Sequence, residues 1–117
     1  MTTTDNTSLD VISSEKVEGT SVYNPAGEKL GSIDDLMIDK YSGQIRFAVL
    51  EFGGFLGMGT DRYPLPWRVL KYSKEKGGYV VPVNKTMLDQ APRYRRDAIP
   101  PYDAAYGSRV DTYYNDF

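Results

Sequence analysis

The sequence predicts a small all-β barrel with one short C-terminal helix and an extended tail, and three observations predict this fold class. Short β-prone segments are separated by turn residues at intervals of roughly 8 to 12 positions, a spacing typical of small barrels. The chain has 117 residues, of which 40% are hydrophobic and 26% are charged, and this composition suits one modest core. Ten tyrosines, four phenylalanines and one tryptophan supply apolar area that offsets the loss of chain entropy. We therefore divide the chain into a mobile lead-in at residues 1–10, the barrel domain at 11–94 and a tyrosine-rich tail at 95–117.

The first half of the barrel is predicted to contain one helical turn and three strands. Ser13 is the expected N-cap of the turn, and Gly19 is its expected left-handed stop. The apolar alternation of the second strand changes parity at residues 34–35, so a β-bulge is expected there. The third strand is apolar on both faces in its second half and should be central. The strands are expected at residues 20–23, 29–39 and 44–52, with turns at 24–27 and 40–43.

The second half is predicted to contain an edge strand, a hairpin and the short helix. Residues 62–67 include Pro64 and Pro66, which cannot donate to a strand ladder, so this segment should lie at an edge or bend. Segments 69–72 and 78–83 flank a polar turn and should form the hairpin. Asn84 then caps a helix that Pro92 terminates. No helical period is found beyond that proline, so the tail is expected to be extended.

The absence of histidine and cysteine excludes several kinds of chemistry. Without them the chain has no Ser-His-Asp triad, thiolate nucleophile, zinc-finger ligand set, disulfide or haem-ligating histidine. Asp, Glu, Lys, Ser and Tyr could still act as acid, base or nucleophile, but they form no recognisable constellation. We expect neither an enzyme nor a bound cofactor.

Charge and hydropathy bear on the partners and the compartment. Fourteen Lys and Arg against sixteen Asp and Glu give a net charge of -2, the reverse of the basic footprint of a nucleic-acid binder. The N-terminal segment has no basic region followed by an apolar one, so no secretion signal is expected. The longest apolar run is residues 47–50, far below the ~20 residues that span a bilayer. We therefore expect a cytoplasmic protein with no membrane span and no nucleic-acid partner.

The glycine-rich segment 53–59 carries three large apolar side chains, Phe55, Leu56 and Met58. An exposed apolar loop is a candidate contact patch, and on this reading the three residues form a homodimer interface. The alternative is that the loop folds over the barrel and buries them within one chain. Both alternatives stay open. The segment lacks the following Lys-Ser/Thr of a phosphate-binding loop.

Two further groups of residues are candidate sites. The tail tyrosines, Tyr102, Tyr106, Tyr113 and Tyr114, could wrap around an unidentified protein partner. Arg93, Arg95 and Arg96 with Tyr94 form a basic and aromatic cluster that could contact RNA by phosphate pairing and stacking. Neighbouring aspartates weaken that cluster, and packing of the tail against the barrel or a solvated linker is the alternative.

The acidic residues Asp34, Asp35 and Asp39 are a third candidate, because hard cations take oxygen ligands. Strand alternation directs neighbouring side chains to opposite faces, and the sequence has no calcium-loop motif. The three are therefore interpreted as solvated acids, and no metal is expected.

Six segments occur together in an order that resembles the PRC-barrel family. They are GTSVYN at 19–24, GEKLGSIDDLMID at 27–39, GQIRF at 43–47, GGFLGMG at 53–59, LPW at 65–67 and APRY at 91–94. The resemblance covers roughly residues 11–94. The family's domain is similar to the cytoplasmic part of the photosynthetic reaction-centre H subunit and to the C-terminal domain of a ribosome maturation factor.

The resemblance implies a PRC-type β-barrel that acts as an interaction module without a shared catalytic residue. It is closest to the stand-alone bacterial type. Our first hypothesis is a non-catalytic, homodimeric adaptor, linked to photosynthetic reaction-centre assembly or electron transfer. The alternative is an RNA- or ribosome-associated maturation factor, which predicts binding that weakens steeply with salt.

Overall fold

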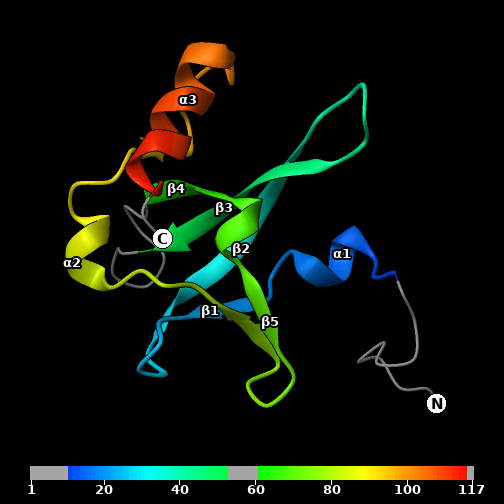
Figure 1. The fold of residues 1–117 in the computed structure, drawn as a ribbon, viewed down its shortest axis with the longest axis vertical. Helices are drawn as coiled ribbons and strands as arrows, with labels where there is room; N and C mark the ends of the chain where they lie inside the picture. Colours follow the sequence, from blue (N-terminus) through cyan, green and yellow to red (C-terminus); the bar gives the residue numbers. More distant parts are fainter. Residues whose placement is uncertain (1–10, 53–60, 116–117) are drawn as a thin grey trace.

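The structure, a computed structural model, describes residues 11–52 and 61–115 of the chain. The described residues contain four short or medium helices: α1 (Ser14–Val17), η1 (Trp67–Val69), α2 (Lys85–Leu88) and α3 (Ala104–Tyr113). The strands are β1 (Ser21–Tyr23), β2 (Lys29–Ile38), β3 (Ile45–Phe52), β4 (Asp61–Pro66), β5 (Lys71–Ser73), β6 (Gly78–Val80) and β7 (Tyr94–Arg95). They form one sheet in the order β5-β6-β1-β2-β3-β4-β7. Figure 1 shows the course of the chain through the helices and the sheet.

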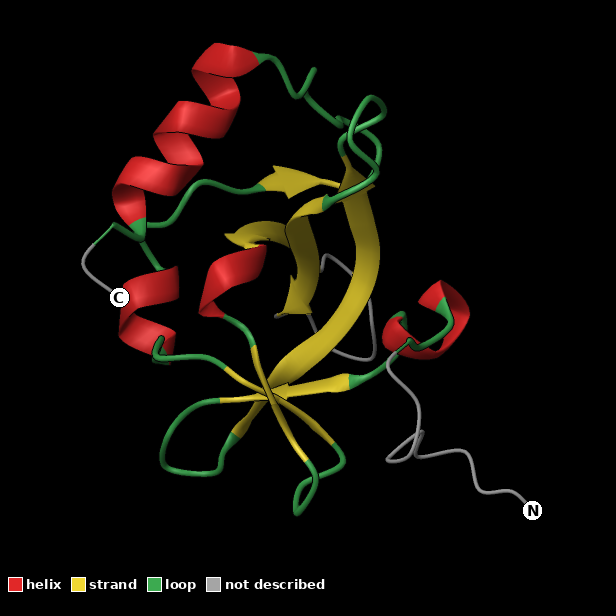
Figure 2. Ribbon diagram, turned by 45° about the vertical axis from the view of Figure 1, so that its right-hand side comes forward, coloured by secondary structure: helices red, strands yellow, loops and turns green. Residues whose placement is uncertain are grey.

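The sheet is strongly curved, and the helices lie on two sides of it (Figure 2). Strands β2, β3 and β4 form an antiparallel meander, and β1 pairs antiparallel with the first half of β2. The β5–β6 hairpin joins this unit through a parallel β1–β6 pair. Helix α3 packs near β4, and α1 lies on the opposite side of the sheet in both views.

Local sequence signals account for most of these elements. The Ser13 side chain accepts from the backbone N–H of Glu15 at the start of α1, and the Asn84 side chain caps α2 in the same manner. The register of β2 against β3 shifts between Ile33 and Asp35, so the predicted bulge is confirmed. The predicted position of β3 in the interior of the sheet is confirmed as well.

The all-β class is confirmed, but the sheet does not close into the predicted barrel. Strands β5 and β7 are its two ends, and within the described ranges neither pairs with the other. Strand β7 covers only Asp61 and Arg62 of β4. The rest of β4 includes Pro64 and Pro66, which have no N–H to donate to a further strand. An open edge at β4 follows from these two prolines.

The prediction of an extended tail is wrong for residues 104–113, which form α3. The Asp103 side chain accepts from the backbone N–H of Tyr106 and caps the helix. Tyr106, Val110 and Tyr114 follow at intervals of four, and all three side chains are buried in the main core cluster. Burial of this stripe outweighs the poor helix propensity of Gly107. The tail therefore contributes to the core.

The core lies between the sheet and the C-terminal helices. Its largest fully buried side chains come from β2, β3, β4, α2 and α3, and Leu88 of α2 is among them. Arg62 is the charged residue at its border, only 2% exposed, with Asp34 at 3.0 Å and Glu51 at 3.5 Å. A buried guanidinium needs such carboxylates to offset the loss of its hydration.

Candidate functional site

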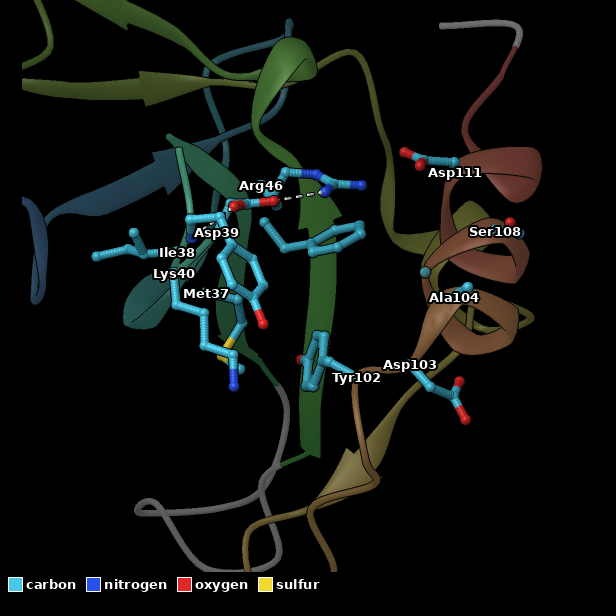
Figure 3. A pocket seen from close by; sticks show the side chains of 13 residues that line it. Met37, Ile38, Asp39, Lys40, Arg46, Tyr102, Asp103, Ala104, Ser108 and Asp111 are labelled. Carbon is cyan, nitrogen blue, oxygen red and sulfur yellow. Dashed lines mark hydrogen bonds and ion pairs between the residues drawn. The ribbon is translucent and has the colours of Figure 1, made fainter. Parts of the chain in front are cut away.

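A groove of about 690 Å³ separates the tip of the β2–β3 hairpin from α3 (Figure 3). One wall is formed by the end of β2, the turn and Arg46. The other wall is the first two turns of α3, where Ala104, Gly107 and Ser108 present small side chains or none. Tyr102 lies between the two walls, and Phe47, against which it packs, also lines the groove. The groove is thus built by segments that are more than 50 residues apart in the chain.

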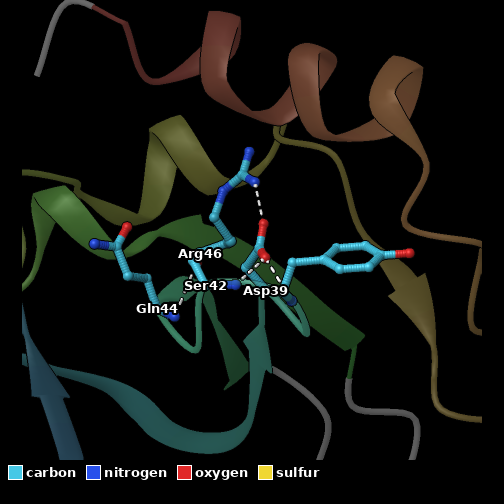
Figure 4. Close-up of polar contacts among 5 residues, drawn as sticks. Asp39, Ser42, Gln44 and Arg46 are labelled. Atoms are coloured by element: carbon cyan, nitrogen blue, oxygen red, sulfur yellow. Dashed lines mark hydrogen bonds and ion pairs between the residues drawn. The ribbon is translucent and has the colours of Figure 1, made fainter.

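The hairpin wall is held in shape by Asp39 (Figure 4). Its carboxylate accepts from the backbone N–H groups of Ser42 and Tyr41 at 2.8 and 2.9 Å. The Arg46 guanidinium lies 3.3 Å from the second carboxylate oxygen. These backbone hydrogen bonds, with the arginine as a lesser cause, lower the pKa of Asp39. The turn is therefore an ordered structure in which the Asp39 carboxylate stays ionised.

Two apolar side chains project from this wall into solvent. Ile38 is 53% exposed, and Tyr41, in the turn itself, is 91% exposed. Lys40 lies between them, with its ammonium 5.9 Å from the centroid of the Tyr41 ring. Large exposed apolar groups beside a groove are typical of contact surfaces.

Aromatic rings form the floor of the groove. The Tyr102 ring packs against Phe47, Tyr94 and Tyr106, with centroid distances of 5.8, 6.2 and 5.1 Å. The hydroxyl groups of Tyr94 and Tyr102 are hydrogen-bonded at 2.7 Å. Burial is the largest cause that raises the pKa of Tyr102, so its phenol stays protonated over the physiological range. A protonated phenol is a hydrogen-bond partner and an apolar surface rather than a base.

The α3 wall carries the acidic groups of the site. Asp103 accepts from the N–H of Tyr106, and the Asp111 carboxylate points toward the groove, facing Arg46 (Figure 3). Among residues 11–52 and 61–115, no ion pair within 4.0 Å joins the two walls. The far end of α3 is fixed by Arg68, which donates to the carbonyl oxygens of Asp111 and Tyr114 at 3.3 and 3.4 Å. This contact places a cation at the negative end of the helix dipole.

The structure places the four tail tyrosines against their own domain. Tyr102 is in the floor of the groove, and Tyr106 and Tyr114 are buried. Tyr113 is half-buried, and its hydroxyl donates to the carbonyl oxygen of Met87 at the end of α2. In this arrangement Tyr106 and Tyr114 have no surface to offer to a partner. Tyr102 alone of the four faces the groove.

The arginine cluster is divided among different surroundings. Arg93 lies 3.5 Å from an Asp61 oxygen and donates to the Tyr63 hydroxyl and the Asp89 carbonyl. Arg95 lies 3.9 Å from an oxygen of Asp97, and Arg96 is exposed. Tyr94 packs inward on Tyr102. The three arginines are exposed and Tyr94 is half-buried, so a contact of this cluster with RNA stays a prediction.

The other candidates are placed as follows. Phe55, Leu56 and Met58 lie outside the described residues. Asp34 and Asp39 are engaged with arginines, and no group of three or more potential ligands in the described segments could hold a metal ion. No helix in these segments is long and apolar enough to cross a membrane.

Sequence reasoning missed the groove because its two walls meet only in the folded chain. Residues 40–43 were assigned as a turn, but a turn sequence does not show which face of it stays exposed. The signal that could have found the second wall is the four-residue spacing of Tyr106, Val110 and Tyr114. This spacing directs Ala104, Ser108 and Asp111 to another face of the same helix.

Comparison with models of protein families identifies the family of this chain. No curated protein matches the chain. The model of the PRC-barrel domain family matches residues 9–88, which include every strand from β1 to β6 and helix α2. The groove's hairpin wall lies within this match and its α3 wall lies beyond it. Because the match covers more than half of the sequence, the chain belongs to the PRC-barrel domain family.

Proposed function

We propose that this protein is a non-catalytic protein-interaction module that takes up a segment of a partner protein in the groove between the hairpin and α3. The observation that carries the proposal is the half-buried Tyr102 ring, which packs on the buried Phe47 and lines the groove between the hairpin wall and the acidic α3 wall. Protein interfaces combine an apolar, aromatic centre with a polar rim, and this groove has both.

The exposed side chains on the rim support the same function. Burying Ile38 and Tyr41 against a partner would remove apolar surface from water, at roughly 25 cal/mol per Å². Aromatic side chains near the centre of an interface commonly carry much of the binding free energy. The ordered turn would lose little conformational freedom on binding.

Non-catalytic binding suits the chemistry of the groove. Asp39 accepts two backbone N–H groups of the turn at one carboxylate oxygen and faces Arg46 with the other, and these contacts lower its pKa, which makes it a weak general base. The Tyr102 phenol has a raised pKa and is a poor proton acceptor. The groove therefore offers hydrogen bonds, charge and apolar area.

We further propose that the protein is a cytoplasmic, homodimeric adaptor, and two cellular processes are candidates for its role. The family resemblance favours photosynthetic reaction-centre assembly or electron transfer, and the alternative is ribosome or RNA metabolism. The ion pairs of Arg93 and Arg95 weaken the RNA alternative, because their charge is already partly compensated. A contact through Phe55, Leu56 and Met58 stays a prediction.

The test is a pair of tryptophan substitutions on adjacent residues of α3. Ala104 lines the groove and Ala105 lies on a different face of the helix, and both are exposed. Ala104→Trp should fill the groove and abolish capture of the partner from the native cells after crosslinking, whereas Ala105→Trp should leave capture unchanged. Equal capture by both variants would show that the groove is not the contact surface.

The same experiment separates protein from RNA partners. Protein recovered through a high-salt wash would support the adaptor. Ribosomal proteins and RNA that wash away with salt would support the alternative, because phosphate contacts weaken steeply as salt rises.

A further inference from the structure

We infer that the segment that fills the groove is the hairpin tip of a second copy of this chain, residues 38–41, and that two copies exchange their tips reciprocally. The inference rests on the proposed function, since it names the partner for the same groove. It differs from the contact predicted for residues 55–58, which involves another part of the chain.

The tip has the rigidity that insertion requires. The Asp39 carboxylate binds two backbone N–H groups of the turn and the Arg46 guanidinium. Gly43 closes the turn with a φ of +78°, a conformation that suits glycine. Because the turn is held by these contacts, its exposed side chains are fixed before binding, and association loses less entropy.

The tip and the groove match in their chemistry. The tip offers an aromatic ring, Tyr41, and a branched aliphatic chain, Ile38, both largely exposed. The groove offers the half-buried Tyr102 ring, which packs on the buried Phe47, as its floor. Aromatic rings prefer edge-to-face or offset contacts with one another, and such pairs add specificity to apolar burial. A volume of about 690 Å³ accommodates several side chains.

The charges also match. The tip wall carries Lys40 and Arg46 against Asp39, a net charge of +1, and the α3 wall carries Asp103 and Asp111, a net charge of -2. Within one chain no ion pair among the described residues joins the two walls. The Lys40 of a second copy would reach the acidic wall and compensate part of its charge.

A second copy is favoured over an unrelated partner because one surface carries both halves of the contact. The tip is itself a wall of the groove, so donor and acceptor lie next to each other. A two-fold axis through this surface brings each tip to the other copy's α3, and the assembly closes at two copies. Each tip then covers the apolar groups that a single copy leaves in solvent.

The first measurement is sedimentation velocity of the full chain over a range of concentrations. We expect a reversible equilibrium between a 13.2 kDa monomer and a dimer of twice that mass. Tyr41→Ser should weaken dimerisation at least tenfold. Its matched control is Ile99→Ser, which removes another exposed side chain (63%) that does not line the groove.

The second measurement is a charge swap at Lys40 and Asp111. Lys40→Glu and Asp111→Lys should each weaken dimerisation at least tenfold at low salt, because each creates two like-charged contacts per dimer. A mixture of the two variants should dimerise again, since every contact in the mixed dimer then joins opposite charges. Lys74→Glu, in the β5–β6 turn, makes the same charge change away from the groove and should have no effect.

Three results would overturn the inference. The chain could be monomeric at every concentration, the mixed variants could fail to recover, or a dimer could survive all the groove variants. A dimer that is lost only in the double variant Phe55→Asp plus Met58→Asp would also overturn the inference, because it would survive every groove variant. The proposed function is judged separately, by partner capture with Ala104→Trp. A monomeric chain whose partner capture depends on Ala104 would therefore retain the function and refute the second copy as occupant.

Discussion

Substituting Val110 in α3 tests whether the helix is docked on the sheet in solution. The change in the free energy of unfolding should have opposite signs for a docked and an undocked helix. Alanine has a higher helix propensity than valine by about 0.6 kcal/mol. If α3 were an undocked helix, Val110→Ala would stabilise it or change nothing. If α3 packs as observed, the substitution removes buried methyl groups and destabilises the whole domain.

The magnitude follows from the burial of this side chain. Val110 is 0% exposed and belongs to the main core cluster. Removing two methyl groups forfeits about 1.6 kcal/mol of transfer free energy, at about 0.8 kcal/mol per buried carbon. The cavity left behind adds to this loss, and the gain in helix propensity subtracts from it. We expect the free energy of unfolding to fall by about 2 kcal/mol, and Tm by roughly 8 to 15 °C.

The assay is urea unfolding followed by circular dichroism, with Thr112→Ala as the control. Thr112 is exposed on the same helix, so its replacement by alanine should be neutral or slightly stabilising. The denaturant slope should stay the same in both variants, which would show that only stability has changed. The docking of α3 is refuted if Val110→Ala behaves like Thr112→Ala.

Three further predictions concern the cap of α3, the tyrosines and the sheet. Arg68→Ala should lower the free energy of unfolding by about 1 kcal/mol, because the carbonyl oxygens of Asp111 and Tyr114 lose their hydrogen-bond donor. Hydrogen exchange of the last amides of α3 should become faster, and an unchanged exchange rate would contradict this. Burial raises the pKa of Tyr102 and Tyr114, so their stabilising contribution is complete below about pH 10 and is lost as the pH rises further. Urea unfolding between about pH 8 and 12 should show that the free energy of unfolding declines as the pH rises. In Tyr102→Phe this decline should be smaller, because one of the two phenols is removed. Gly31→Ala should lower the free energy of unfolding by more than about 3 kcal/mol or abolish folding, because a Cβ there would lie 2.0 Å from the backbone oxygen of Glu51. Gly43→Ala should lower it by only about 1 kcal/mol, because the positive φ is the one obstacle at that position. Thermal unfolding of both variants measures the difference.

The strands and caps could be predicted from the sequence because their signals are local. The parity change at residues 34–35 indicated the bulge, and Asn84 before an apolar pair indicated the cap of α2. Both depend on neighbouring residues alone. The polar turns between strands could be predicted in the same way, since Pro fixes its own φ and Gly accepts a positive φ wherever they occur.

Helix α3 and the groove could not be predicted in this way. The extended tail is predicted from the lack of a recognised helical period, and Gly107, Asp111 and Thr112 also lower the helix propensity of this segment. Only the sheet supplies the apolar face that makes the helix stable, because Tyr106 and Val110 are buried against it. The tail tyrosines stood out by number, but their number did not show that Tyr106 and Tyr114 turn inward.

The parallel pairing of β1 with β6 has a consequence for the order of folding. Val22 pairs with Tyr79, 57 residues along the chain, whereas β2, β3 and β4 are joined by short connections. Closing so long a loop costs entropy before any contact repays it, so this step is intrinsically slow. We expect the β2–β3–β4 meander to form the folding nucleus and the β5–β6 hairpin to join it last. Replacements in the hairpin should then speed unfolding far more than they slow folding, since their contacts are absent from the transition state.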